Sequence, residues 1–412
     1  MPFFKNNKPF VFWPASSAMR FPYSEGPPNL RRPETVGRGG FCRDVHCILI
    51  LTFLLPFFTV AQTQDQLIQE AEEILKAGRI YSVTFKEVVP PSGNMHDYMS
   101  QGPYWWPDPK KPDGLPYIRR DGELNPEIKK ISDHDQHNQL ANESYLLAQT
   151  WKHTKEDKYA LWASHLIRTW FINEKTKQTP NLEFGQGIPG RTVGRGIGII
   201  ETTRHPKIQE AATILLESPY WNKEDHAALQ QWFTDYLNWL LTSEKGIDEG
   251  NWHNNHGSWY DVQVAAAALF IGKEEIAKAQ VARFKTRLAS QMAEDGSQPH
   301  ELARTKSWNY SNMNLNAWIQ MARLADQVGI DLWNYESPNG RSIELAVEWL
   351  FPYAAGEKEW DYKQITPMKF DTTTEVFYWA AKNYPKSKFK LLATKLIKTN
   401  ADGLFLLTHP TL

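Results

Sequence analysis

The dominant pattern along the chain is a helical one, in which apolar side chains recur three and four positions apart. Residues 66–77 show it clearly, and Gly78 follows as a stop signal. Similar patterns, most of them separated by short polar breaks, cover residues 138–153, 156–172, 207–217, 223–243, 257–271, 274–293, 312–328, 341–352, 372–383 and 386–399. The pattern therefore predicts about eleven helices.

Strand signals are weak. Residues 80–90 have a strand-like composition, but the segment ends in Pro90-Pro91, and no alternation of strands and helices indicates a parallel sheet. About eleven helices without a sheet predict an all-α fold, an incomplete (α/α) toroid of helical hairpins, with a helical solenoid as the alternative. Two long stretches rich in Gly and Pro or Arg, 91–136 and 179–206, are expected to form loops over one end of this array.

The N-terminal region has the features of a targeting segment. Residues 48–60 are apolar and uncharged, and Ala61 precedes a polar stretch, as in a signal peptide with a small-residue cleavage site. The run is shorter than the roughly 20 residues of a membrane-spanning helix, which is the alternative interpretation. We interpret residues 1–61 as a mis-assigned N-terminal extension plus a signal peptide. Residues 62–412 are then a single exported domain, periplasmic or secreted, with no membrane contact after cleavage.

Composition narrows the function classes. Lys and Arg number 46 against 47 Asp and Glu, a net charge of −1, which argues against a nucleic-acid partner. The two cysteines, Cys42 and Cys47, both precede the predicted cleavage site, so the body of the protein has neither a disulfide framework nor a cysteine zinc site. His-Glu-x-x-His is missing as well, and we expect neither a metal nor a cofactor. The 17 tryptophans suit either a core or a carbohydrate-binding cleft.

Two clusters of polar and aromatic residues stand out at the starts of predicted helices. Residues 250–260 contain Asn, His and Trp repeatedly, although capping a helix requires only one such residue. Residues 297–312 contain Arg304, Lys306 and Tyr310, which could all face one cleft. Taken singly, Tyr310 is more typical of a core aromatic with a hydrogen-bonded hydroxyl, and Arg304 of an exposed cation.

Together these residues resemble a known family. Asn255-His256, Arg304 after 48 further residues, Tyr310 six residues later and the Tyr-Trp-Trp-Pro-Asp-Pro segment at 104–109 are similar to motifs of the alginate lyase superfamily of polysaccharide lyases. The resemblance covers roughly residues 90–350 and is strongest to the secreted Bacteroidetes-type branch. It implies an incomplete α/α toroid and β-elimination on an acidic polysaccharide, with Asn255, His256, Arg304 and Tyr310 as the catalytic set.

The chemistry of β-elimination gives these four residues distinct roles. Removing the C5 proton of a uronate places charge on the C6 carboxylate, which Asn255 and Arg304 could stabilise as preorganised donors. Tyr310 suits proton transfer, and a nearby Arg304 is expected to lower its pKa from about 10 and favour the phenolate. His256 could hold the carboxylate or act as a base from the opposite face of the sugar.

The stereochemistry of the sugar sets the number of groups required. In β-mannuronate and β-glucuronate, H5 and O4 lie on the same side of the ring, so Tyr310 alone could take one proton and return one. In α-guluronate they lie on opposite sides, and His256 would be the base. Alginate with mannuronate-containing sequences is the expected substrate, and a glucuronan-type polymer is the alternative.

Substrate-binding residues are harder to identify from sequence. Trp rings could stack on sugars, and cations could pair with a polyanion; the candidates are Trp105, Trp106, His134, Gln136, Arg195, Arg204, Trp252 and Lys306, with Arg191 and Trp308 as further ones. A glycoside hydrolase would instead need two placed carboxylates, for which Asp248, Glu249, Glu294 and Asp295 are available. A non-catalytic glycan-binding protein would keep the aromatic residues and could dispense with Tyr310 and His256.

Overall fold

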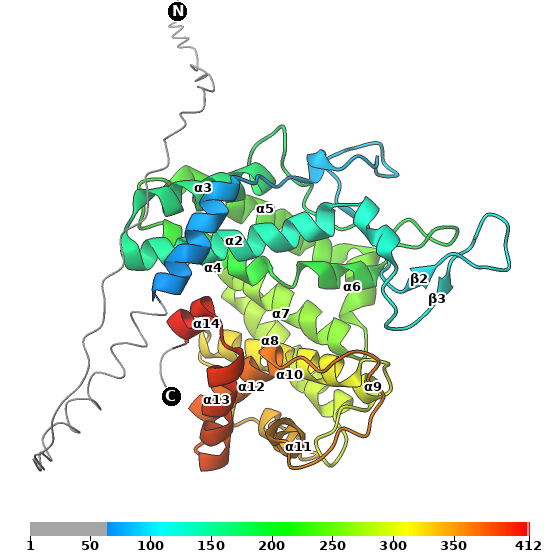
Figure 1. The fold of residues 1–412 in the computed structure, drawn as a ribbon, viewed down its shortest axis with the longest axis vertical. Helices are drawn as coiled ribbons and strands as arrows, with labels where there is room; N and C mark the ends of the chain where they lie inside the picture. Colours follow the sequence, from blue (N-terminus) through cyan, green and yellow to red (C-terminus); the bar gives the residue numbers. More distant parts are fainter. Residues whose placement is uncertain (1–63, 410–411) are drawn as a thin grey trace, which may run out of the picture. The chain divides into compact units, whose positions relative to one another are not determined.

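The computed structural model describes residues 64–409 and 412, which belong to one compact unit (Figure 1). The predicted signal peptide, the N-terminal extension and both cysteines lie outside the described residues. Within the described part, every helix is too short or too polar to cross a membrane.

All eleven predicted helices are present. A helix over residues 64–77 is followed by α2 (Asp133–Thr154), α3 (Asp157–Phe171), α4 (His205–Leu215), α5 (Lys223–Thr242), α7 (Asn255–Phe270), α8 (Glu274–Gln291), α10 (Ser307–Asp326), α11 (Ile343–Ala355), α12 (Asp371–Asn383) and α13 (Ser387–Asn400). Three short helices were not predicted: α6 (Glu244–Gly250), α9 (Pro299–Leu302) and α14 (Gly403–Thr408). Helices of four to seven residues are too short to display the helical period.

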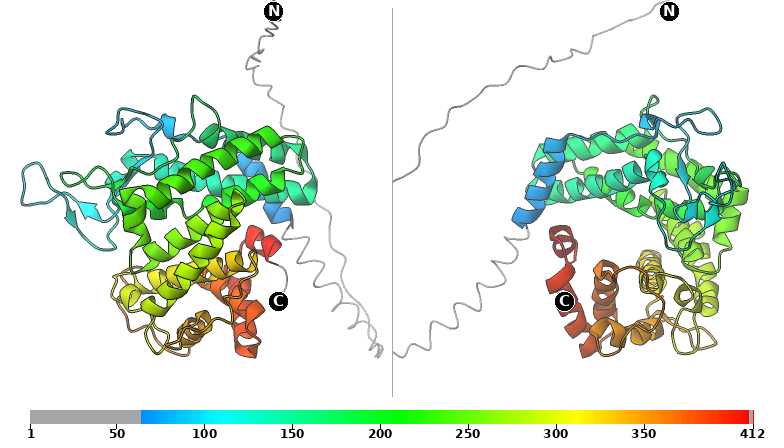
Figure 2. Two further views of the ribbon diagram at one scale, coloured as in Figure 1. Left: turned by 180° about the vertical axis from the view of Figure 1, so that it is seen from behind. Right: turned by 45° about the vertical axis from the view of Figure 1, so that its right-hand side comes forward.

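The helices pack as neighbouring hairpins around an open ring (Figure 2). α2 packs on α3, α7 on α8 and α12 on α13, while α10 joins α7 to α12. α7 is buried along most of its length and supplies Tyr260 and Val264 to one hydrophobic cluster and Trp259 and Val262 to the other. This arrangement confirms the predicted all-α ring, with α7 between its two halves.

The few strands lie in the two segments predicted to be irregular. β1 (Met99–Gln101) pairs in parallel with β4 (Phe184–Gly187), and β2 (Trp105–Trp106) pairs antiparallel with β3 (Ile118–Arg119). Short 3₁₀ helices, η2 (Pro126–Lys130) and η3 (Gly196–Thr202), follow in the same segments. The strand-like residues 80–90 contain instead a 3₁₀ turn, η1 (Val83–Phe85), because the Ser82 side chain accepts a hydrogen bond from the Thr84 N–H and caps it.

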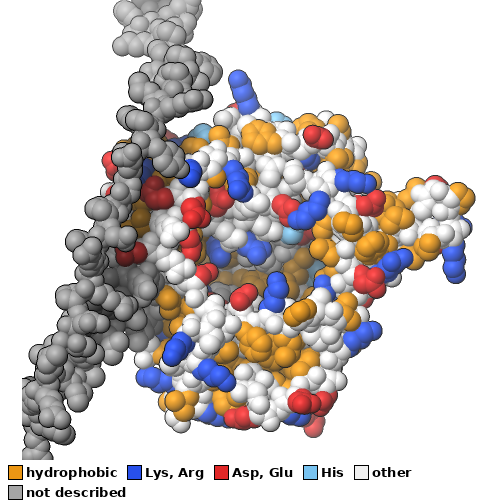
Figure 3. Space-filling view, in the orientation of Figure 1, with side chains coloured by type: hydrophobic (Ala, Val, Ile, Leu, Met, Phe, Trp, Pro, Cys, Tyr) orange, Lys and Arg blue, Asp and Glu red, His pale blue; other side chains and the backbone are white. Residues whose placement is uncertain are grey.

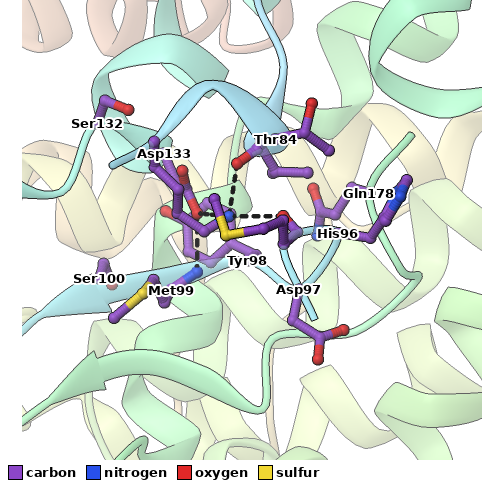
Figure 4. Close-up of polar contacts among 12 residues, drawn as sticks. Thr84, His96, Asp97, Tyr98, Met99, Ser100, Ser132, Asp133 and Gln178 are labelled. Atoms are coloured by element: carbon purple, nitrogen blue, oxygen red, sulfur yellow. Dashed lines mark hydrogen bonds and ion pairs between the residues drawn. The ribbon is translucent and has the colours of Figure 1, made fainter. Parts of the chain in front are cut away.

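A buried ion pair attaches the first irregular segment to the helical ring. Lys86 Nζ lies 3.0 Å from Asp133 Oδ2, and both side chains are fully buried. The Met99 N–H donates to the same carboxylate, which fixes β1 at the start of α2 (Figure 4). Burial raises the pKa of Asp133 to about 6, although Lys86 opposes the shift. Since β1 leads directly into residues 102–106, this pair positions the loop that forms one wall of the cavity described next.

Candidate active site

One cavity of about 490 Å³ brings together segments that are far apart in the sequence. Its lining comes from the loop at 103–105, β3, the second irregular segment, the start of α7, α9 and the start of α10. The four residues predicted to be catalytic, Asn255, His256, Arg304 and Tyr310, all line it. Figure 3 shows a hollow in this face of the described unit, with Lys and Arg side chains on its walls.

The charge of the cavity is one-sided. Arg119, Arg195 and Arg304 line it, whereas no Asp or Glu of the described chain does. The site is therefore suited to an anionic ligand. Within the described residues there is also no group of three His, Cys, Asp or Glu side chains placed to hold a metal ion.

Asn255 is held at the first turn of α7 by a buried acid. Its backbone N–H donates to Glu301 Oε1 at 2.7 Å, and its Nδ2 donates to Glu301 Oε2 at 2.8 Å. Burial raises the pKa of Glu301, against the two hydrogen bonds from Asn255. The Asn255 side chain is consequently fixed in one orientation before any ligand enters.

His256 is oriented in the same way by a second buried acid. Its Nδ1 lies 2.8 Å from Glu249 Oε1, and the Glu249 side chain is 1% exposed. Because the two ring nitrogens lie on opposite edges of the imidazole, Nε2 is the one left for a ligand. Asn254 adds the helix cap, accepting a hydrogen bond from the His256 N–H.

Arg304 is clamped by Asp121, a residue from the loop after β3. The Arg304 Nε and Nη2 atoms donate to the two Asp121 oxygens at 3.2 and 2.8 Å. Burial acts to raise the pKa of Asp121, but hydrogen bonds from Arg304 and Thr305 outweigh it and hold that pKa well below its usual range. The guanidinium centre lies 4.0 Å from the centroid of the Tyr310 ring.

Tyr310 has a partner that the sequence did not indicate. Its hydroxyl oxygen lies 2.7 Å from that of Tyr104, so the two hydroxyls share a hydrogen bond. Burial and the neighbouring Tyr104 raise the pKa of Tyr310 well above 10, and Arg304 only partly offsets this. Arg304 thus acts on Tyr310 in the expected direction, but burial outweighs the cation and the neutral hydroxyl is the favoured form.

Three of the predicted substrate-binding residues line the cavity: Trp105, Arg195 and Trp252. Arg195 donates from Nε and Nη2 to Gln186, and its guanidinium lies 5.7 Å from the Trp105 ring. Arg191 lies over the same ring at 5.1 Å. The cavity also contains Arg119, Gln186, His253 and His300, which the sequence reasoning did not select.

The remaining predicted binding residues lie elsewhere. Trp106 packs under Arg120, and Lys306 lies over the Tyr104 ring without lining the cavity. Gln136 accepts a hydrogen bond from the Ser82 N–H at the start of α2.

The last two predicted binding residues, Arg204 and His134, lie near the start of α4 rather than in this cavity. The Nη1 atom of Arg204 donates to Asn138, which also contacts His134. Arg204 lines a second cavity, of about 670 Å³, together with Lys207.

Trp308 and the carboxylates of the alternative hydrolase interpretation do not provide the roles considered for them. Trp308 is fully buried and its Nε1 donates to the Lys369 carbonyl, so its ring is not available to a sugar. Asp248, Glu294 and Asp295 do not line the cavity, and the fourth candidate carboxylate, Glu249, is buried against His256. Hydrolysis requires two carboxylates facing the scissile bond, and this cavity lacks them in the described chain.

Comparisons with known proteins show the family of the chain. The alginate lyase family profile matches residues 82–360. A crystal structure of an alginate lyase from Bacteroides ovatus is 35% identical, with 85% of this chain and 93% of that chain covered and a TM-score of 0.81. Alginate lyase A1-III from a Sphingomonas species is 16% identical, with 79% and 90% covered and a TM-score of 0.52, a likeness of fold alone. A variant of A1-III complexed with a tetrasaccharide has the same identity and a TM-score of 0.54, with 80% and 88% covered. No curated protein matches the chain.

Proposed function

The chain belongs to the alginate lyase family and is a polysaccharide lyase, and from its site we propose that it cleaves alginate at mannuronate-containing sequences by β-elimination. The observation that carries the proposal is the cavity itself. It gathers Asn255, His256, Arg304 and Tyr310, and the described residues that line it include arginines but no carboxylate. The structural relatives are alginate lyases, and one was solved in complex with a tetrasaccharide, which supports the same substrate class.

In the proposed reaction the uronate carboxylate lies against Asn255, His256 and Arg304. Donors aimed at this group stabilise the negative charge that develops when the C5 proton leaves, and their orientation is already fixed by Glu301, Glu249 and Asp121. Preorganisation of this kind avoids the cost of reorienting the donors during the reaction.

Tyr310 carries the proton transfers in this proposal. It takes the C5 proton and returns a proton to O4, which departs as the C4=C5 double bond forms. Because the resting hydroxyl is neutral, Tyr310 first releases its own proton to solvent, and the resulting phenolate can accept a hydrogen bond from the Tyr104 hydroxyl. A single residue can serve both steps only where H5 and O4 lie on one side of the ring, which favours mannuronate over guluronate.

The test is an absorbance assay with polymannuronate, polyguluronate and glucuronan in parallel. Elimination produces a conjugated uronate that absorbs in the ultraviolet, whereas hydrolysis produces reducing ends without absorbance. We expect the absorbance to rise most rapidly with polymannuronate. A rise with glucuronan alone would reassign the substrate to a β-glucuronate polymer, and new reducing ends without absorbance would refute β-elimination.

We also propose that the protein acts outside the cytoplasm, because residues 48–61 have the pattern of a signal peptide. N-terminal sequencing of the protein recovered from an expressing bacterium tests this proposal. A mature chain that begins near Gln62 is expected, and recovery of the uncleaved chain from the cytoplasm would contradict it.

A further inference from the structure

A buried acid lies behind His256, on the side away from the cavity. Glu249 Oε1 is 2.8 Å from His256 Nδ1, and the Glu249 side chain is 1% exposed. Its other oxygen, Oε2, is buried and has no hydrogen-bond partner among the described residues. A carboxylate removed from water with one partner depends on that partner for its stabilisation. Glu249 and His256 therefore act as a pair rather than as two independent groups.

The backbone that follows Glu249 is held in place by Arg287 of α8. Arg287 donates from Nη2 to the Gly250 carbonyl and from Nη1 to the Trp252 carbonyl, each at 2.6 Å. The guanidinium is itself anchored by the fully buried Asp261 at 2.5 Å. Such a network of buried hydrogen bonds leaves the end of α6 little freedom to move Glu249.

The first turn of α7 contacts the Arg287 side chain at Gly257. A Cβ added to Gly257 would lie 2.1 Å from Arg287 Nη1 and 2.1 Å from the Trp252 carbonyl oxygen. Only glycine fits at this position, directly after His256. The segment from Gly250 to Gly257 is thus fixed around the guanidinium, which sets the direction in which the imidazole points.

The other charged groups near the pair do not replace this contact. Asp248 raises the pKa of Glu249, whereas Arg195 lowers it. Glu301, which is hydrogen-bonded to Asn255, interacts electrostatically with His256. The hydroxyls of Tyr236 and Tyr260 are the remaining titratable groups that sense Glu249, and both are neutral near pH 7 because burial raises their pKa values. Burial raises the pKa of Glu249, and its hydrogen bond to His256 opposes that shift, so the two side chains form one coupled contact.

We propose that Glu249 is a positioning residue that orients His256 and keeps a proton on Nε2, so that His256 binds the uronate carboxylate as a cation and does not act as a base. This inference rests on the proposed function and deepens it. A carboxylate next to an imidazole favours the imidazolium form. An anionic substrate on the opposite edge favours the same form, so the pair is ionised when a uronate is bound.

The variant that separates charge from orientation is Glu249→Gln. Its amide oxygen still accepts a hydrogen bond from Nδ1, but the negative charge is gone. We expect the alkaline limb of the kcat/KM profile on polymannuronate to move to lower pH by about 1–2 pH units. Activity should fall about 10- to 100-fold near pH 8 and recover toward the wild-type value near the acidic end of the profile.

Glu375→Gln is the matched control. Glu375 of α12 also pairs with a histidine, His409 at 3.3 Å, but neither residue lines the cavity. Its pH profile should superimpose on that of the wild type. A Glu249→Gln profile that keeps its shape and is only scaled down would overturn the proposal, since it would indicate a purely structural role.

A second measurement does not depend on substrate. In the resting protein, nuclear magnetic resonance of the 12 histidines can follow the His256 ring, identified by its absence in His256→Gln. Glu249→Gln should lower the pH midpoint of that signal, and an unchanged midpoint would refute the proposal even if no polyuronate is cleaved. If Glu249→Gln fails to fold, Glu249→Asp keeps the charge and should reduce kcat without moving the alkaline limb. A shifted limb in Glu249→Asp would contradict the proposed role.

Discussion

The sharpest prediction concerns the hydroxyl of Tyr310. Tyr310→Phe removes one oxygen and leaves the ring in place, with the Arg304 guanidinium 4.0 Å from the ring centroid. If Tyr310 carries the proton transfers, kcat should fall by about 10²- to 10⁴-fold, the usual contribution of a general acid–base group. That loss corresponds to about 3–5 kcal/mol of the activation barrier. KM should change little, because the carboxylate donors remain in place.

Tyr104→Phe provides the matched comparison, since it removes the same 2.7 Å hydrogen bond from the other side. Loss of a neutral hydrogen bond costs about 1 kcal/mol, or roughly a fivefold drop in rate. The assay is the initial rate of ultraviolet absorbance on polymannuronate, with thermal unfolding recorded for both variants. Equal losses in the two variants, or a Tyr310→Phe rate within tenfold of the wild type, would refute the assignment of the proton transfers to Tyr310.

Three further predictions follow from buried charges. Asp121→Asn should lower kcat/KM on polymannuronate by about tenfold, because Arg304 loses a charge-assisted clamp; an unchanged kcat/KM would show that the clamp is unnecessary. Burial lowers the pKa of the His205 imidazole to about 3, against about 6.5 in an unfolded chain. Between these two pH values only the unfolded state binds a proton at His205, so the free energy of unfolding should fall as pH drops below about 6.5. The decline in Tm between about pH 7 and pH 5 should be shallower in His205→Phe, and identical slopes would contradict this. Arg287→Leu should lower the free energy of unfolding in urea by about 3–5 kcal/mol, because the buried Asp261 loses its hydrogen-bonded cation and keeps only Arg283 at 3.9 Å; a change below about 1 kcal/mol would refute this prediction.

The helical ring was predictable because each long helix carries its own apolar face. Local periodicity is enough to find such segments, and all eleven are present. The start of α2 was predicted five residues too late, since Asp133, His134, Asp135 and Gln136 are polar residues with no periodic signal. Asp133 begins the helix because the fully buried Lys86, 47 positions earlier in the chain, pairs with it.

The candidate catalytic set could be selected from the sequence, but the residues that hold it in place could not. Asn255, His256, Arg304 and Tyr310 belong to dense polar clusters beside helix starts, which local inspection can find. Their partners are single acidic or hydroxyl side chains, seven to 206 positions away, and no local pattern indicates the pairing: Glu249, Glu301, Asp121 and Tyr104. Trp308 illustrates the converse error, because composition alone does not separate a core ring from a sugar-stacking one.

The hydrogen bond between Tyr104 and Tyr310 joins residues 206 positions apart, and the Asp121–Arg304 pair joins residues 183 apart. The chain entropy lost in closing such long loops must be met before either contact contributes stability. Contacts this distant in sequence form slowly and late in folding. The helices of each half can therefore be largely in place while the protein is still inert. If the proposed residues are the catalytic ones, activity requires the first irregular segment to dock onto the beginning of α10, and turnover then reports the completion of folding rather than the presence of helices.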